Sequence, residues 1–297
     1  MSNATAAGSA APNTVAAGGA GGSSAPAAAA NRSSHPVIFF DDSEKEVTNV
    51  REKCPVAKII HVVADPALGI NDAAFRDEMK SNPVYNIILE NKDKLTEGRE
   101  DPLGSSKKQR YTPSAGINAS HIAKFREFLG DATKGTVVFD WDHTLNVNNA
   151  FYSLDEFGVA PSVELDEAYV ELLCGGKERV KMLREGILKV CDERGIRKII
   201  LTSGPYAIPV NPSIPEKYTK HINFIRVLKQ LVGSDADVYH TSGPFNGKSL
   251  TGANDRLLYD KGASFQALGL CGTKGGFRQS RKRRTSFRKS RKQNRRK

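Results

Sequence analysis

Short apolar runs alternate along the chain with segments in which apolar residues recur at helical spacing. Each run has the length of a single strand and few polar residues inside it, as in a parallel sheet covered on both faces. The predicted strands are residues 37–40, 57–62, 135–142, 197–204 and 237–242. Helices are predicted in the polar stretch after the first strand and at residues 71–80, 121–132, 177–195, 222–233 and 256–269. This alternation predicts an α/β fold, a Rossmann-like doubly wound parallel sheet with helices on both faces.

The two ends of the chain lack this periodicity. Residues 1–35 are rich in Ala, Gly and Ser, and Arg32 is their only charged side chain. An Ala-rich helix is the alternative for this segment, but interspersed Gly and Pro disfavour it. We therefore predict a disordered leader over 1–35, a folded domain over 36–271 and a disordered basic tail over 272–297.

The positive charge of the chain is concentrated in that tail. The formal net charge is +11, and the stretch 278–297 holds twelve Lys and Arg with no Asp or Glu. Without it the remainder is close to neutral. Counterion release makes non-specific nucleic-acid binding by such a tail nearly unavoidable at low salt. The alternatives are a nuclear-localisation signal and a solubilising extension.

The cysteines and the hydropathy bear on location. Cys54, Cys174, Cys191 and Cys271 are scattered, without a C-x-x-C pair or a histidine at ligand spacing. This favours reduced thiols over a disulfide framework or a zinc site. No apolar run approaches the ~18 residues of a membrane span. No secretory signal is recognisable at the N-terminus. We expect an intracellular protein, in the cytoplasm or nucleus, without membrane contact.

Polar residues stand where three of the predicted strands end. They are Asp41 and Asp42, then Asp140 and Asp142, then Thr202 and Ser203. The carboxyl ends of parallel strands meet at the edge where ligands bind. Carboxylates gathered there repel one another unless a cation neutralises them, and oxygen ligands without His or Cys favour Mg²⁺. Such a site suits phosphoryl transfer, with one carboxylate as a possible nucleophile.

These segments resemble the four motifs of the haloacid dehalogenase (HAD) superfamily of phosphotransferases. DWDHT (140–144) matches its D-x-D-x-T first motif, and IILTSG (199–204) is similar to the second. Lys261 in DKGASFQALG is the candidate for the third, the lysine that opens a helix, and Lys248 is its rival. VIFFDDSEKEV (37–47) resembles the fourth, a strand that ends in paired acids.

The order of the motifs differs from that of the family. Here the fourth motif comes first and is followed by the first, second and third. The simplest explanation is a circularly permuted HAD-like fold, cut between the lysine helix and the DD strand. Residues 64–134 then bridge the old ends. The segment 146–196 leaves little more than ~30 residues for a cap, so a small or absent cap is expected over an open site.

The resemblance assigns catalytic roles to four residues. Asp140 is the nucleophile, and Asp142 is the general acid and base. Thr202 hydrogen-bonds the phosphoryl group, and Lys261 stabilises its charge. Thr202 with Ser203 as a simple turn is the alternative for the second motif.

The resemblance also gives a metal site. Mg²⁺ is held by Asp41 or Asp42, or both, together with Asp140 and the main-chain carbonyl of Asp142, and we favour Asp41 as the direct ligand. A plain helix N-cap is the alternative for the acid pair. Glu46 stands where related strands often continue to an Asn.

The expected function is hydrolysis of a phosphorylated substrate by a Mg²⁺-dependent phosphatase. A second hypothesis is a catalytically weak binding module, tethered to nucleic acid or a capsid by the 278–297 tail. Permuted domains with basic tails suggest a large DNA virus, which adds the virion and the infected host cell to the expected locations.

Overall fold

Five parallel strands in the order β2-β1-β3-β4-β5 form the central sheet. The computed structural model describes residues 35–94, 101–104, 111–203, 220–241, 244–245, 248–249 and 260–272. The strands of the sheet are β1 (Val37–Asp41), β2 (Lys58–His61), β3 (Thr136–Phe139), β4 (Arg197–Thr202) and β5 (Asp237–His240). A short antiparallel pair, β6 (Pro244–Phe245) with β7 (Lys248–Ser249), follows. The predicted α/β fold with a parallel sheet flanked by helices is confirmed.

Helices connect the strands. They are α1 (Glu44–Lys53), α2 (Asp72–Met79), α3 (Pro83–Glu90), α4 (Ala119–Leu129), α5 (Val163–Cys174), α6 (Lys177–Leu183), α7 (Lys189–Glu193), α8 (Lys220–Val232) and α9 (Lys261–Ala267). The short turns η1 (Lys92–Lys94) and η2 (Leu154–Phe157) are 3₁₀ helices, and η3 (Arg184–Leu188) is a π-helical turn between α6 and α7. Two of the helices, α3 and α5, were not predicted. Each begins at a side-chain N-cap, Asn82 and Ser162 respectively.

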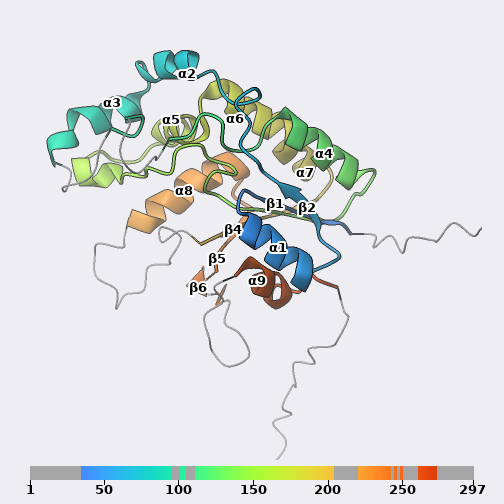
Figure 1. Cartoon of the computed structure of the whole chain (residues 1–297). Helices are drawn as coiled ribbons and strands as arrows, with labels where there is room; N and C mark the ends of the chain where they lie inside the picture. Colours follow the sequence, from blue (N-terminus) through green and yellow to red (C-terminus); the bar gives the residue numbers. More distant parts are fainter. Residues whose placement is uncertain are drawn as a thin grey trace, which may run out of the picture. The chain divides into compact units, whose positions relative to one another are not determined.

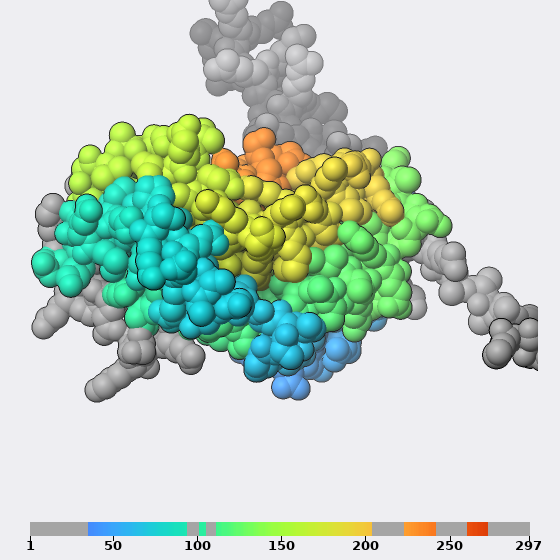
Figure 2. All heavy atoms as spheres, turned by 90° about the horizontal axis from the view of Figure 1, so that it is seen from above, coloured from blue at the N-terminus to red at the C-terminus, as the bar shows by residue number. Residues whose placement is uncertain are grey.

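The two faces of the sheet carry different layers. Successive strand residues point to opposite faces, so Phe39 lies on one side and Phe40 on the other. Phe39 belongs to a small core beneath α1 and α9. Phe40 belongs to the larger core, which the other long helices cover (Figures 1 and 2). Residues of α2, α3 and α5 share this larger core, so in the described part of the chain they pack as one body with the sheet.

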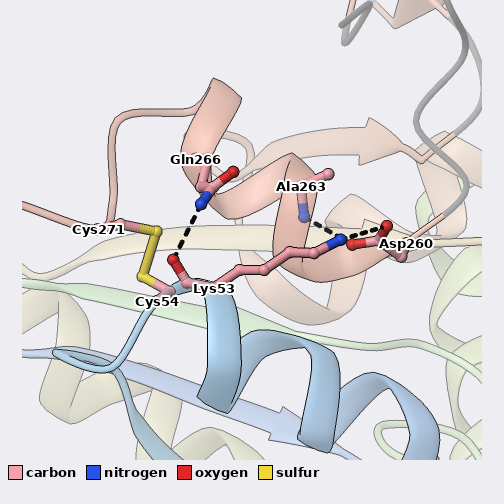
Figure 3. The surroundings of a disulfide bond; sticks show 6 residues. All are labelled: Lys53, Cys54, Asp260, Ala263, Gln266 and Cys271. Carbon is pink, nitrogen blue, oxygen red and sulfur yellow. Dashed lines mark hydrogen bonds and ion pairs between the residues drawn. A yellow bond between two sulfur atoms is a disulfide. The ribbon is translucent and has the colours of Figure 1, made fainter. Parts of the chain in front are cut away.

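A disulfide joins Cys54, at the end of α1, to Cys271, just after α9 (Figure 3). The prediction of four reduced thiols is therefore wrong for this pair. The two cysteines are 217 positions apart in sequence, and only the packing of α9 on α1 brings them together. Cys174 and Cys191 are free and buried.

The described residues belong to one compact unit, Ser34–Lys297. Nearly all of the predicted leader and the tail beyond Gly272 lie outside the described residues. None of the described helices has both the length and the apolar character of a membrane span.

Candidate functional site

Two aspartates stand side by side at the carboxyl edge of the sheet. Phe40 of β1 pairs with Phe139 of β3, so Asp41 and Asp140, the next residues on each strand, are brought to the same level. The main-chain N–H of Asp140 donates to the carbonyl of Phe40 at 2.9 Å. Both carboxylates are buried, with Asp41 at 0% and Asp140 at 6% exposure. Two buried carboxylates side by side require positive charge nearby.

That charge comes from Lys261, the first residue of α9. Its Nζ donates to Oδ2 of Asp41 and to Oδ1 of Asp140, each at 2.5 Å. Burial alone would lower the pKa of Lys261, but Asp140 and Asp41 together raise it above the ordinary lysine value. The ammonium therefore stays protonated and bridges the two strand ends.

Asp42 completes an acidic cluster. One oxygen each from Asp41, Asp42 and Asp140 lie within 4.8 Å of one another, a spacing that can hold a metal ion. Burial and, to a smaller extent, the charge of Asp140 raise the pKa of Asp41 to about 7, against the lowering effect of Lys261. Burial and Asp140 also raise the pKa of Asp42. When ionised, the three carboxylates carry more negative charge than the single ammonium of Lys261 neutralises, which is the condition that favours a bound cation.

The loop after β3 holds Asp142. Burial, with the charge of Asp140, raises the pKa of Asp142 to about 7. Asn146 donates from Nδ2 to Oδ1 of Asp142 at 3.2 Å and accepts from the N–H of His143 at 2.8 Å. His143 has a left-handed backbone (φ 52°), and its position lowers the pKa of Asp42. Asn146 thus ties the loop to Asp142, a role that no motif in the sequence indicates.

Arg179 of α6 holds the same loop through its main-chain carbonyls. Its buried guanidinium donates to the carbonyls of Leu145 and Cys174, each at 2.7 Å, and to that of Thr144 at 3.3 Å. Gly116 makes room for it, because a Cβ there would lie 2.1 Å from Nη2 of Arg179. Since the acceptors are main-chain carbonyls, no residue pattern in the sequence reveals this contact.

The second predicted motif lies on the next strand. Thr202 ends β4, the other neighbour of β3, and is fully buried at the same edge of the sheet. Ser203 accepts from the Thr241 hydroxyl at 3.3 Å. The structure places Lys261 in the acidic cluster, whereas the side chain of Lys248 lies outside the described part of the chain.

Glu46 and Trp141 do not belong to the acidic cluster of Asp41, Asp42 and Asp140. Glu46 accepts the main-chain N–H of Lys261 at 2.8 Å, so it fastens α9 to α1. Trp141 is buried and packs edge-on against Phe224.

Comparison of the chain with protein-family models, with curated proteins and with solved structures finds no significant match.

Proposed function

We propose that this chain is a Mg²⁺-dependent phosphatase that acts through an aspartyl-phosphate on Asp140. One observation carries the proposal: Lys261 bridges Asp41 and Asp140 while Asp42 completes a cation-sized acidic cluster. The cluster stands at the carboxyl edge of a parallel sheet, where ligands bind. A nucleophilic carboxylate, a fixed ammonium and a cation site are the parts that phosphoryl transfer needs.

Asp41 and Asp42 are both candidates for direct contact with the ion. Both oxygens of Asp41 already accept hydrogen bonds, Oδ1 from the N–H of Ser43 at 2.8 Å and Oδ2 from Lys261. Each of these oxygens keeps a second lone pair, so Asp41 remains our preferred direct ligand, with Asp42 beside it. The remaining ligands would be Asp140 and the main-chain carbonyl of Asp142. A bound Mg²⁺ supplies neutralisation of the charge on the phosphoryl group.

The protein residues then divide the reaction between them. A carboxylate oxygen of Asp140 attacks phosphorus, and the bond to the substrate oxygen breaks as Asp142 gives that oxygen a proton. The raised pKa of Asp142 favours the protonated form that this step needs. Asp142 next takes a proton from water, which attacks the phosphorus, releases inorganic phosphate and restores Asp140. Lys261 and Thr202 hold the phosphoryl oxygens.

A permuted member of the haloacid dehalogenase superfamily accounts for the order of these residues. Cys271 is bonded to Cys54, and Cys54 lies four residues before the start of β2. The chain therefore leaves α9 at the edge of the sheet where β2 starts. The neighbouring parallel strand β1 begins at that same edge. A short link from α9 into β1 is therefore sterically reasonable, and it would restore the usual order of the motifs.

The test is hydrolysis of an aryl phosphate by the purified full chain with and without Mg²⁺. We expect Mg²⁺-dependent turnover, and an acid-stable phosphate adduct on the peptide that contains Asp140 when the reaction is quenched. Asp140→Asn should abolish both. Asp131→Asn, an exposed aspartate after α4, is the matched control and should keep full activity.

Full turnover by Asp140→Asn would reject the mechanism. A protein with no turnover on any aryl or nucleotide phosphate would leave the tethered binding module as the better hypothesis, with the basic tail as its contact to nucleic acid.

A further inference from the structure

Helix α9 is fastened to one end of α1 at several points (Figure 3). Asp260 caps α9 by accepting the N–H of Ala263 at 2.7 Å, and its other oxygen accepts from Nζ of Lys53 at 2.8 Å. Gln266 donates to the main-chain carbonyl of Lys53 at 3.1 Å. The disulfide between Cys54 and Cys271 links the two helices covalently, and among the described residues it is the only such cross-link. Lys53 and Cys54 thus attach α9 to the C-terminal end of α1.

The other end of α1 lies at the acidic cluster. Ser43, the N-cap of α1, donates to Asp41, and Glu46 in its first turn accepts the N–H of Lys261. Within the described chain α9 packs mainly against α1. The place of the Lys261 ammonium therefore depends on how α9 sits on α1, and the disulfide is the covalent part of that attachment.

We propose that the Cys54–Cys271 disulfide holds Lys261 between Asp41 and Asp140, and that its reduction by a dithiol lowers the activity of the site. The activity part of this inference rests on the proposed phosphatase function. The placement of Lys261 does not, because it is a property of the two helices.

The reduction is a two-electron exchange with a dithiol. A thiolate of the dithiol attacks Sγ of Cys271, which is partly exposed, whereas Cys54 is fully buried. Cys54 leaves as a thiolate and is protonated. The second thiol of the reagent then attacks the mixed disulfide, which releases Cys271 as a thiol and leaves the reagent as a cyclic disulfide. The reagent loses two hydrogens, and the protein gains them.

The decisive measurement is the acylation of Lys261 by a trace of acetic anhydride, read by peptide mass spectrometry. Lys261 is 3% exposed and paired with two carboxylates, so it should react slowly in the oxidised full chain. Dithiothreitol should raise its rate about tenfold or more, because α9 then opens locally. Cys271→Ser should show the faster rate with or without the reagent.

Lys198 is the matched control. It is also buried, at 2% exposure, and pairs with Asp192 and Asp235 away from α9. Its acylation should not change on reduction. An unchanged rate at Lys261, or an equal rise at both lysines, would overturn the inference, since the disulfide would then be irrelevant to the site or a staple of the whole fold.

Activity on an aryl phosphate with Mg²⁺ is the second readout. We expect reduction to lower the turnover of the wild type several-fold, reversibly on reoxidation. The turnover of Cys271→Ser should already be at the lower level and should not change on addition of the reagent. Faster acylation of Lys261 with no turnover in either state would support the disulfide inference and reject the phosphatase. Turnover with no redox effect on Lys261 would do the reverse.

Discussion

A lysine and two aspartates buried together stabilise one another, and none of the three charges is stable there alone. Lys261, Asp41 and Asp140 are all less than a tenth exposed, and each depends on the others for charge compensation. Removal of one partner from such a group leaves an uncompensated buried charge. A cation held by Asp41, Asp42 and Asp140 would compensate in part for a missing ammonium.

Lys261→Met tests this dependence. The variant keeps the volume of the side chain but leaves the buried carboxylates unpaired, so we expect a loss of about 3–5 kcal/mol in the free energy of unfolding without metal. Mg²⁺ should restore part of it, and turnover should fall by at least about 10²-fold. Urea unfolding with chelator or Mg²⁺ measures the effect.

Lys198→Met is the control for that variant. It removes another buried lysine, whose partners Asp192 and Asp235 are exposed carboxylates remote from the cluster. Its stability should fall without recovery in Mg²⁺. Equal recovery of both variants would contradict a cation site beside Lys261.

The two free thiols give a second prediction at this scale. Burial raises the pKa of Cys174 and Cys191 to about 12, so at pH 8 roughly one thiol in 10⁴ is ionised. Neither should react with iodoacetamide in the native protein, and both should react in urea. Native labelling of either thiol, detected by peptide mass spectrometry, would disprove the packing described for it.

The sequence predicted the ionic part of the site better than the rest. Asp41 and Asp140 were expected at one edge of the sheet because acids at strand ends follow from strand patterns, whereas Lys261 was suggested only by the resemblance to the third motif; the structure brings the three side chains together. Asn146 and Arg179 were missed. Their partners are a loop carboxylate and main-chain carbonyls, and such contacts depend on the path of the loop rather than on residue type.

At the scale of elements, the contact between α1 and α9 depends on a glycine. A Cβ on Gly262 would lie 2.4 Å from the carbonyl oxygen of Asn49, so the two backbones touch at this point. Gly262 directly follows Lys261. The close approach therefore also sets the depth at which the ammonium enters the site.

Gly262→Ala should push the two helices apart. Alanine favours an isolated helix, but here we expect a net loss of about 1–3 kcal/mol in stability, because the backbone of α1 cannot move away without repacking. Turnover should fall as Lys261 withdraws. Ala267→Ser, on the exposed side of the same helix, should change neither property.

Assays of both variants at a temperature well below their melting points separate the two effects. Full turnover by Gly262→Ala would show that the distance between α1 and α9 does not control Lys261.

The strands and most helices followed from apolar periodicity, whereas α3 and α5 did not. Helix α3 lies in the segment 64–134, which was interpreted as a bridge between the old ends, and α5 lies in 146–196, which was judged only by its length as a cap. The N-cap of each helix is a single residue, which is a weak signal. The disulfide was beyond prediction for a different reason. Two cysteines 217 positions apart carry no pairing signal until the helices that hold them are packed.

On the scale of the whole molecule, residues 278–297 carry a formal charge of +12, and the rest of the chain is close to neutral. Removal of residues 273–297 keeps Cys271 and its disulfide. The shortened chain should keep its turnover on an aryl phosphate. It should also lose its salt-dependent retention on immobilised single-stranded DNA, since the cations that release counterions are gone.

The matched comparison is the full chain on the same column over a salt gradient. Retention of the shortened chain at the same salt concentration would place the nucleic-acid contact elsewhere in the protein.

The bond between Cys54 and Cys271 also makes the molecule a covalent ring. Every peptide bond from residue 54 to residue 271 lies inside this ring, so a single cut by a protease there leaves one molecule of unchanged mass apart from the added water. The fragments separate on a denaturing gel only after reduction. If the chain is permuted as we propose, the sulfur bridge gives α9 a covalent link to α1 where the permutation removed its peptide link to β1.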